Sequence, residues 1–331
     1  MAQPVGSAKD CSCWPIAPFK KQSCSLNPTL VYKVSGKLYT TSMSPIFLSI
    51  LAGLGGMFGW GTSDFFAGLF SKKIGHFKTF FWSQTAGLIF AAVLIFFFAA
   101  SFNVPTLIAV LLPVATIFYA AAYLFFYKGF GIGNISTVSA TINLWAVFTV
   151  LFAFIFLGQR LSGLQFLGVA MIIVGVTLVA LKWSDIKNKN SHLLKGVKET
   201  VAAAFLFGIF WNLSDVIAKE IGWLPTTIFV KVGVILFLIL FSFFVKRELT
   251  ITKSSTQTKL LVALVGILEA FAVASVNWGL TISGAILVTP IASALSIITI
   301  TMALVFLKEK VTKIQGLGIV IAVAGIILTA F

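Results

Sequence analysis

Continuous apolar runs, separated by short polar segments, fill almost the whole chain after Pro45. A helix needs about 20 apolar residues to cross the hydrocarbon core of a bilayer. The runs therefore predict an all-α membrane protein with ten transmembrane helices, at 46–67, 78–100, 105–127, 133–157, 161–181, 196–218, 225–245, 259–281, 284–307 and 312–331. Strands are not expected there, because the runs lack the alternation of apolar and polar positions that a membrane β-barrel shows.

The composition supports a membrane protein over a soluble one. Hydrophobic residues make up 59% of the 331 residues and charged residues 10%, compared with roughly 45–50% and roughly 25% in soluble domains. In a soluble protein the net charge of +15 would indicate a nucleic-acid partner. Here the basic residues lie almost entirely between the apolar runs, where they indicate membrane topology instead.

Residues 1–42 differ from the rest of the chain. They are polar and rich in Ser, Pro and Lys, and they contain no apolar stretch long enough for a secretory signal. Two interpretations stay open. The segment is either a cytoplasmic tail without fixed structure or sequence upstream of a true start at Met43, and we favour the second.

The chain offers few residues for metal chemistry. All its cysteines, Cys11, Cys13 and Cys24, lie in the N-terminal segment, and its histidines, His76 and His192, fall in predicted loops. Walker-type motifs, which cradle the phosphates of ATP, are missing from the sequence. We therefore expect no metal site, no cofactor and no coupling to ATP.

The second half of the apolar region repeats the first. Phe-Leu-Gly-Gln-Arg-Leu at 156–161 corresponds to Phe-Leu-Lys-Glu-Lys-Val at 306–311, and Trp-Gly-Thr-Ser-Asp at 60–64 corresponds to Trp-Asn-Leu-Ser-Asp at 211–215. Each repeat holds five predicted helices. Because five is odd, the second repeat must enter the membrane from the opposite side. The sequence thus predicts two inverted repeats, 46–181 and 196–331, as in secondary transporters with a site between the repeats.

The segment 156–161, followed by Gln165, Gly168 and Gly175, resembles the end of an EamA-type repeat of the drug/metabolite transporter superfamily. In the second copy, Glu309 fits the acid that is usual in the family, whereas Lys308 replaces its glycine. The resemblance covers about residues 46–331 and implies a ten-helix transporter. Family members move amino acids, sugars, nucleotide-linked metabolites or drugs, so the resemblance leaves the substrate open.

The basic residues and the resemblance give different orientations. The loops after the odd-numbered predicted helices hold nearly all the Lys and Arg outside the N-terminal segment, and the opposite set holds Arg160 and Lys219. The positive-inside rule then places both termini outside, whereas better-known family members keep both in the cytoplasm. In either orientation we expect a multi-pass protein of the plasma membrane of a prokaryotic cell.

Ionisable residues inside the predicted helices are the first functional candidates, because a charge in hydrocarbon is costly. Glu269 lies near the middle of its helix and is placed to carry a proton or meet a cationic group. Lys231 is its expected partner. The two residues either grip a zwitterion such as an amino acid or form a salt bridge that only joins two helices. Their equivalents in the first repeat are Tyr119 and Gln84.

The repeated Trp-x-x-Ser-Asp boxes place Trp and Asp on one helix face. Asp64 and Asp215 come near the ends of their predicted helices, close to lysines. They are therefore candidates for gating salt bridges, with ordinary interfacial acids as the alternative. Trp60 and Trp211 are either belt residues at the interface or cavity residues that stack on a substrate.

Three further residues are candidates for the cavity wall: Asn143, Trp145 and Asn277. Asn143 lies mid-helix and should face protein, whereas Asn277 is expected nearer an interface, where water satisfies its amide. Pro290 removes a backbone donor and is expected to kink its helix, as prolines do in transporter helices beside a cavity.

These features predict a secondary active transporter that moves small organic metabolites by alternating access, with amino acids or amines as the first guess and protons, through Glu269, as the coupling ion. The alternatives are an uncoupled facilitator for sugars or other metabolites and a multidrug exporter. An intramembrane lipid enzyme would need clustered acids or a nucleophile at one depth, and the sequence offers none, so we expect no catalytic residue. The expected partners are a small-molecule substrate, the lipid bilayer and protons, with no nucleic acid.

Overall fold

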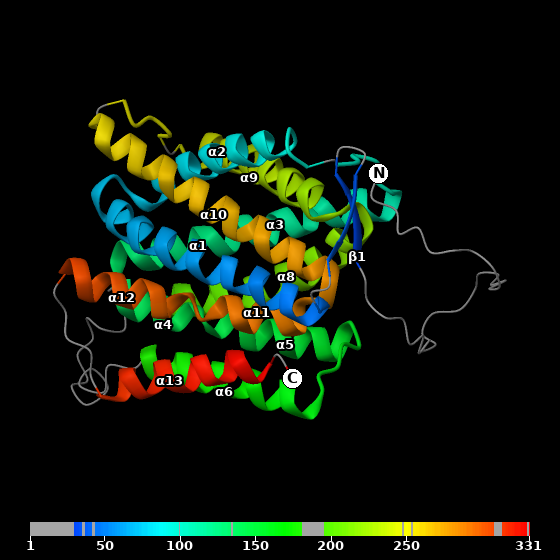
Figure 1. Ribbon diagram of the computed structural model, residues 1–331. Coiled ribbons are helices and arrows are strands. Elements are labelled where there is room, and N and C mark those ends of the chain that lie inside the picture. Colours follow the sequence, from blue (N-terminus) through cyan, green and yellow to red (C-terminus); the bar gives the residue numbers. More distant parts are fainter. Residues whose placement is uncertain are drawn as a thin grey trace.

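The computed structural model describes residues 30–34, 37–41, 44–98, 100–133, 135–180, 195–246, 248–252, 254–307, 313–329 and 331. The described chain forms a bundle of helices that run mostly along one direction (Figure 1). In chain order these are α1 (Pro45–Lys73), α2 (His76–Leu94), α3 (Thr106–Ile132), α4 (Ile135–Ile142), α5 (Leu144–Phe156), α6 (Gly163–Ala180), α8 (Val197–Ile221), α9 (Trp223–Val245), α10 (Thr256–Ser283), α11 (Ala285–Ser293), α12 (Leu295–Leu307) and α13 (Lys313–Leu328).

A short hairpin precedes the bundle. Strands β1 (Leu30–Val34) and β2 (Lys37–Thr41) pair antiparallel, with Leu30 opposite Thr41. The apolar pattern did not predict them, because each strand has only five residues, far fewer than a membrane span. The local composition is nevertheless that of strands, since both segments are rich in β-branched and aromatic residues. The cysteines Cys11, Cys13 and Cys24 and the histidine His192 lie outside the described residues.

Helices of the described chain overlap each of the predicted ranges, although the range 78–100 is helical only as far as Leu94. Among the described residues, seven helices are long and apolar enough to cross a membrane: α1, α2, α3, α8, α9, α10, and α11 with the first part of α12. Three shorter apolar helices are α5, most of α6, and the part of α13 from Gly316 to Leu328. The chain is therefore an integral, multi-pass membrane protein.

Two of the predicted helices are broken. The range 133–157 divides into α4 and α5 at Asn143, and the range 284–307 divides into α11 and α12 at Ala294. The two breaks lie at matching places in the two repeats. Pro290 lies inside α11, one turn before the second break. The sequence predicted a kink in this region but no break in either helix.

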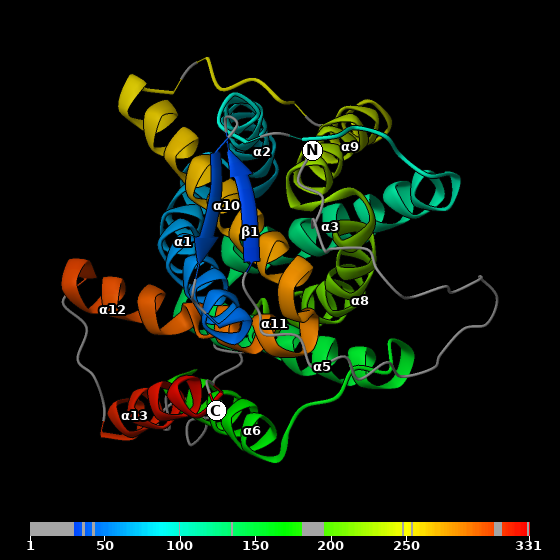
Figure 2. The same cartoon turned by 45° about the vertical axis from the view of Figure 1, so that its right-hand side comes forward.

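Helices α6 and α13, which are equivalent in the two repeats, pack side by side at one edge of the bundle (Figures 1 and 2). A Cβ atom added at Gly168 would lie 2.8 Å from the carbonyl oxygen of Gly325, and one added at Gly175 would lie 2.6 Å from that of Gly318. The backbones therefore touch, and the helices run antiparallel. Gly168 matches Gly318 and Gly175 matches Gly325 in the repeat, so the contacts are reciprocal, as a two-fold relation requires.

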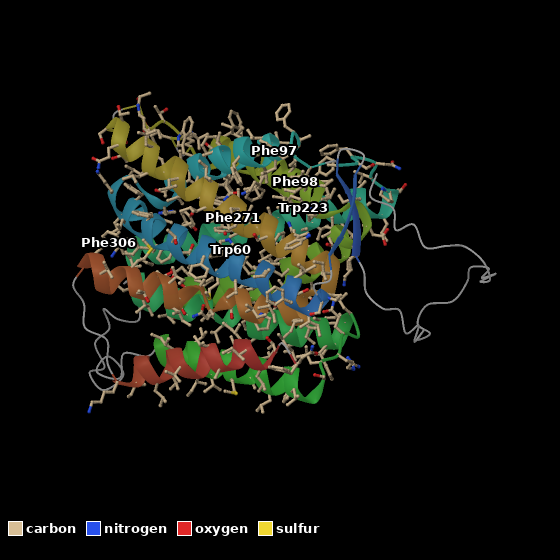
Figure 3. All side chains as sticks on the ribbon, viewed as in Figure 1. Trp60, Phe97, Phe98, Trp223, Phe271 and Phe306 are labelled. Carbon is tan, nitrogen blue, oxygen red and sulfur yellow. The ribbon has the colours of Figure 1, made fainter. Side chains whose placement is uncertain are left out.

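The centre of the bundle is built from equivalent helices. Helix α1 packs along α10, and their counterparts α8 and α3 pack along each other. Outside this centre, large apolar side chains face outward, with Phe96 87% exposed and Phe243 80% exposed. Phe97, Phe98, Phe271 and Phe306 lie on the same outer surface (Figure 3). Soluble proteins rarely expose so much apolar surface, whereas lipid contact requires it.

Candidate functional site

A pocket lies where the two broken helices meet the central helices. Ile142 and Trp145 flank the break between α4 and α5, and Leu295 follows the break between α11 and α12. The pocket is narrow in this conformation: its empty space of ≈ 320 Å³ includes open solvent, and the centre of a water-sized sphere can move through only ≈ 30 Å³ of it. Its lining is completed by Trp60, Asp64, Tyr123, Phe126, Phe207 and Trp211. Discontinuous helices commonly form the substrate sites of transporters, because irregular backbone in a membrane is tolerated where it lines a cavity.

Three tryptophans from three helices dominate the pocket. Trp60 of α1, Trp145 of α5 and Trp211 of α8 are all buried. The ring centroid of Trp60 lies 5.8 Å from that of Trp145 and 5.3 Å from that of Trp211, and the centroids of Trp145 and Trp211 are 5.9 Å apart. Trp60 lies midway along the bundle (Figure 3). Trp60 and Trp211 therefore line the cavity, which corresponds to the second of their two interpretations, and the cavity-wall candidate Trp145 lies beside them.

Asp64 lies in the same pocket, one helical turn after Trp60, and is only 3% exposed. Its expected position near a helix end is wrong, because α1 continues to Lys73. Lys73 donates a hydrogen bond to Thr258 Oγ1, at 3.1 Å, and not to the acid. Across the residues that the structure describes, no side chain forms a hydrogen bond or an ion pair with Asp64.

Glu269 and Lys231 form a buried ion pair next to the pocket, on the other side of Tyr123. Lys231 Nζ lies 2.5 Å from Glu269 Oε2 and donates a second hydrogen bond to Gln84 Oε1, at 3.1 Å. The hydroxyl of Tyr119 donates to the other carboxylate oxygen, Oε1. Both charged side chains are 1% exposed. The four candidate residues thus form one cluster that joins α2, α3, α9 and α10, and its two opposite charges balance.

Tyr123 and Phe207 connect this cluster to the pocket, since Phe207 lines the pocket and its ring contacts that of Tyr119, with centroids 6.0 Å apart. Tyr123 lines the pocket, and its hydroxyl lies 3.4 Å from Glu269 Oε1. Neither Glu269 nor Lys231 lines the pocket directly. The direct ion pair corresponds to the structural salt bridge that the sequence left as an alternative, and it leaves neither charge free for a zwitterion in this conformation.

Asp215, the counterpart of Asp64, has different surroundings. Lys219 Nζ lies 2.9 Å from Asp215 Oδ1, and the side-chain amide of Gln159 donates to Oδ2. Gln159 Oε1 in turn accepts a hydrogen bond from the backbone N–H of Ile286, at 3.0 Å, in the first turn of α11. Asp215 therefore lies near a helix end beside a lysine, as predicted, and Gln159 links it to α11.

The two asparagine candidates lie outside the pocket lining. Asn143 donates from Nδ2 to Ser296 Oγ, at 2.8 Å, and so ties the first helix break to the start of α12. Asn277 accepts from Ser214 Oγ at 2.8 Å and donates to Thr227 Oγ1 at 2.9 Å. Its expected place near a wet interface is wrong, because it is fully buried and bonded by protein.

Several lining residues were not predicted. Phe126, Ile142, Phe207 and Leu295 are apolar, and an apolar side chain in a membrane helix does not stand out in the sequence as a polar or ionisable one does. Tyr123 could have been found, because Tyr119, Tyr123 and Phe126 recur at the spacing of one helix face. In the described part of the chain, no group of three or more His, Cys, Asp or Glu residues is arranged to hold a metal ion.

Comparisons with known proteins agree with this architecture. The EamA-like transporter family matches the chain twice, over residues 47–181 and 194–331. The fold is similar to that of a crystal structure with a TM-score of 0.68, at 14% sequence identity, over 85% of this chain and 95% of the other. At that identity the likeness shows the fold alone. A comparison with curated proteins gave no match.

Proposed function

Because the chain belongs to the EamA-like transporter family of the drug/metabolite transporter superfamily, we propose that it moves small organic metabolites across its membrane by alternating access. Amino acids and amines are the first candidates. The observation that carries the proposal is the pocket at the two helix breaks, lined by residues of both repeats. Transporters built from inverted repeats place their substrate at such a position and rock one repeat against the other around it.

The proposed architecture has ten spans. With α4 and α5 counted as one broken span, and α11 and α12 as another, the described helices correspond one to one with the predicted ranges. The antiparallel packing of α6 and α13 supports an inverted arrangement of two five-helix repeats, 46–181 and 196–331. The boundaries of the family match, 47–181 and 194–331, support the same division. The proposed location is the plasma membrane of a prokaryotic cell.

Asp215 and Gln159 are proposed to close one end of the pathway. Gln159 lies in the connection between α5 and α6 and bonds at once to α8, through Asp215, and to α11, through the N–H of Ile286. Helices α8 and α11 both belong to the second repeat, whereas Gln159 belongs to the first, so its contacts join the two repeats. A contact that ties them together stabilises the closed state at this end, and its loss is required for opening. Asp215 therefore keeps its proposed gating role, whereas Asp64 is reassigned to the pocket.

Glu269 is proposed to couple transport to protons. A proton on its carboxylate would remove the counter-ion of Lys231 and leave a charge buried without a partner, which is costly in a low-dielectric interior. The helices that carry the pair would then favour another arrangement. Tyr123, which touches both Glu269 and the pocket, is the route by which the substrate and the proton affect each other.

The test is flux in liposomes that contain the full chain. Pooled amino acids, amines and sugars are offered with and without a proton gradient, to the wild type and to Glu269→Gln. The matched control is Glu248→Gln, an exposed acid outside the bundle core. We expect gradient-driven flux that Glu269→Gln uncouples and Glu248→Gln leaves intact. Flux insensitive to the gradient and to Glu269→Gln would support the uncoupled facilitator. No flux of any compound would contradict the transport function.

A further inference from the structure

We propose that the pocket binds a monovalent methylated ammonium ion, held between the carboxylate of Asp64 and the indole rings of Trp60, Trp145 and Trp211. This inference rests on the proposed function only in taking the pocket as the transport site. Binding itself is a property of the folded protein and is measured without transport. The argument depends on the charge of the pocket, on its aromatic walls and on its shortage of hydrogen-bond acceptors.

The pocket carries one negative group that nothing in its surroundings balances. Asp64 is 3% exposed and has no basic partner among the described side chains. Lys231 is already held by Glu269 at 2.5 Å and by Gln84 at 3.1 Å, and Lys219 is held by Asp215. A buried carboxylate without a counter-ion is unfavourable. A ligand that brings one positive charge would supply that counter-ion.

The walls of the pocket are suited to the same charge. Three indole rings meet beside Asp64 with centroids 5.3–5.9 Å apart. Tryptophan attracts cations more strongly than other aromatic residues do, and cages of aromatic rings recognise quaternary ammonium groups. Desolvation strengthens this attraction, and all three tryptophans are buried. The carboxylate of Asp64 and the three indole rings therefore both favour a cationic ligand.

The shortage of acceptors distinguishes among cations. A primary ammonium has three N–H donors, each of which needs an acceptor, and an unmet buried donor is costly. The side chains that line the pocket offer only the Asp64 carboxylate and the Tyr123 hydroxyl as acceptors, since indoles only donate. Methyl groups need no acceptor and fit the apolar walls, which are formed by Phe126, Ile142, Phe207 and Leu295. A methylated ammonium thus fits better than a primary amine.

The same charges disfavour a zwitterion. The carboxylate of an amino acid would approach Asp64, and the described residues offer it no free cation in or beside the pocket. Of the two substrate classes first considered, amino acids and amines, the pocket therefore favours amines, and methylated ones above all.

The test compares three probes of similar shape by calorimetric titration of the purified full chain in detergent. Choline is the cation, and 3,3-dimethylbutan-1-ol, in which carbon replaces the nitrogen of choline, is its neutral isostere. Glycine betaine is the zwitterion. We expect choline to bind at least about tenfold more tightly than either of the others. Asp64→Asn should remove that preference and leave the binding of the neutral isostere unchanged, which also shows that the variant is folded. Glu248→Gln is the control and should keep the preference.

A second variant separates the ring contribution from the charge. Trp211→Leu keeps an apolar wall but removes one ring, so choline binding should weaken several-fold more than isostere binding does. The inference is overturned if choline and its isostere bind equally, if betaine binds more tightly, if Asp64→Asn keeps the preference, or if choline does not bind. Flux of another metabolite without choline binding would leave the transport function and remove this ligand class. Choline binding that depends on Asp64, without flux of any compound, would support this ligand class and contradict the transport function.

Discussion

Trp60 and Trp211 occupy equivalent positions in the two repeats, and their indole rings contact each other with centroids 5.3 Å apart. Two residues related by a two-fold axis touch each other only where they lie close to that axis. The same holds for Tyr119 with Glu269, its equivalent, and for Gln84 with Lys231. The axis that relates the repeats therefore passes through the pocket and the ion-pair cluster.

Replacing one member of the Glu269–Lys231 ion pair should destabilise the fold more than replacing both members with apolar residues. Glu269→Leu leaves the ammonium of Lys231 buried without a counter-ion and should lower the free energy of unfolding by about 3–5 kcal/mol. The double variant Glu269→Leu, Lys231→Met leaves no buried charge and should recover most of that loss. Thermal unfolding in detergent measures both. A double variant as unstable as Glu269→Leu alone would contradict a structural role for the pair.

Gly266 should tolerate no side chain. A Cβ atom there would overlap the carbonyl oxygen of Ser83, where α2 crosses α10. Because the clashing atom belongs to backbone, no rotamer change relieves it, and Gly266→Ala should cost about 1–3 kcal/mol or more. Gly163→Ala is the control, since nothing lies within 4 Å of its added Cβ, and should change stability by less than about 0.5 kcal/mol. Equal melting temperatures for the two variants would show that α2 and α10 are not packed this closely.

Gln159 should hold the end of the pathway at α11 closed. Its bond to the Asp215 carboxylate is charge-assisted, so its loss should shift the balance toward the open state by about 1.5–3 kcal/mol, or more than about tenfold. The reporter is Ala285→Cys, a buried position at the start of α11, in a chain whose three native cysteines are replaced by serine. A water-soluble maleimide should label it faster after Gln159→Ala.

The control for this experiment is Gln165→Ala, because among the described residues Gln165 bonds only to Ser162, in the same exposed turn. It should leave the labelling rate unchanged. If both glutamine variants label at the wild-type rate, the Gln159 contact does not restrain the opening.

The helices and the repeats could be predicted from sequence, because lipid leaves a spanning chain few choices. Every backbone group must be bonded within the chain, so an apolar run of sufficient length is a helix. The duplicated Trp-Asp boxes and the charges at Glu269 and Lys231 were equally visible. Their partnership followed from the rule that a charge in a membrane needs a counter-ion. In the structure Glu269 and Lys231 form an ion pair, and the tryptophans of the two boxes, Trp60 and Trp211, contact each other.

The position of Asp64 and the two helix breaks could not be predicted. Asp64 was expected near a helix end because the predicted helix stopped at 67, but the helix continues through Leu69 and Phe70 and ends at Lys73. The break at Asn143 has no glycine or proline beside it in the sequence. Asn143 bonds to Ser296, which lies far along the chain. That contact arises only when the two repeats are assembled, so a local pattern contains no sign of it.

The most direct test of alternating access around this pocket is the reactivity of a cysteine at Leu295, which lines the pocket and is 3% exposed. Leu295→Cys, in the chain without native cysteines, is treated with a membrane-impermeant thiol reagent in right-side-out and in inside-out vesicles. Phe271→Cys, on the outer apolar surface, is the control that lipid should protect. We predict that Cys at 295 reacts in both vesicle types. Reaction from one side only, or from neither, would contradict the account.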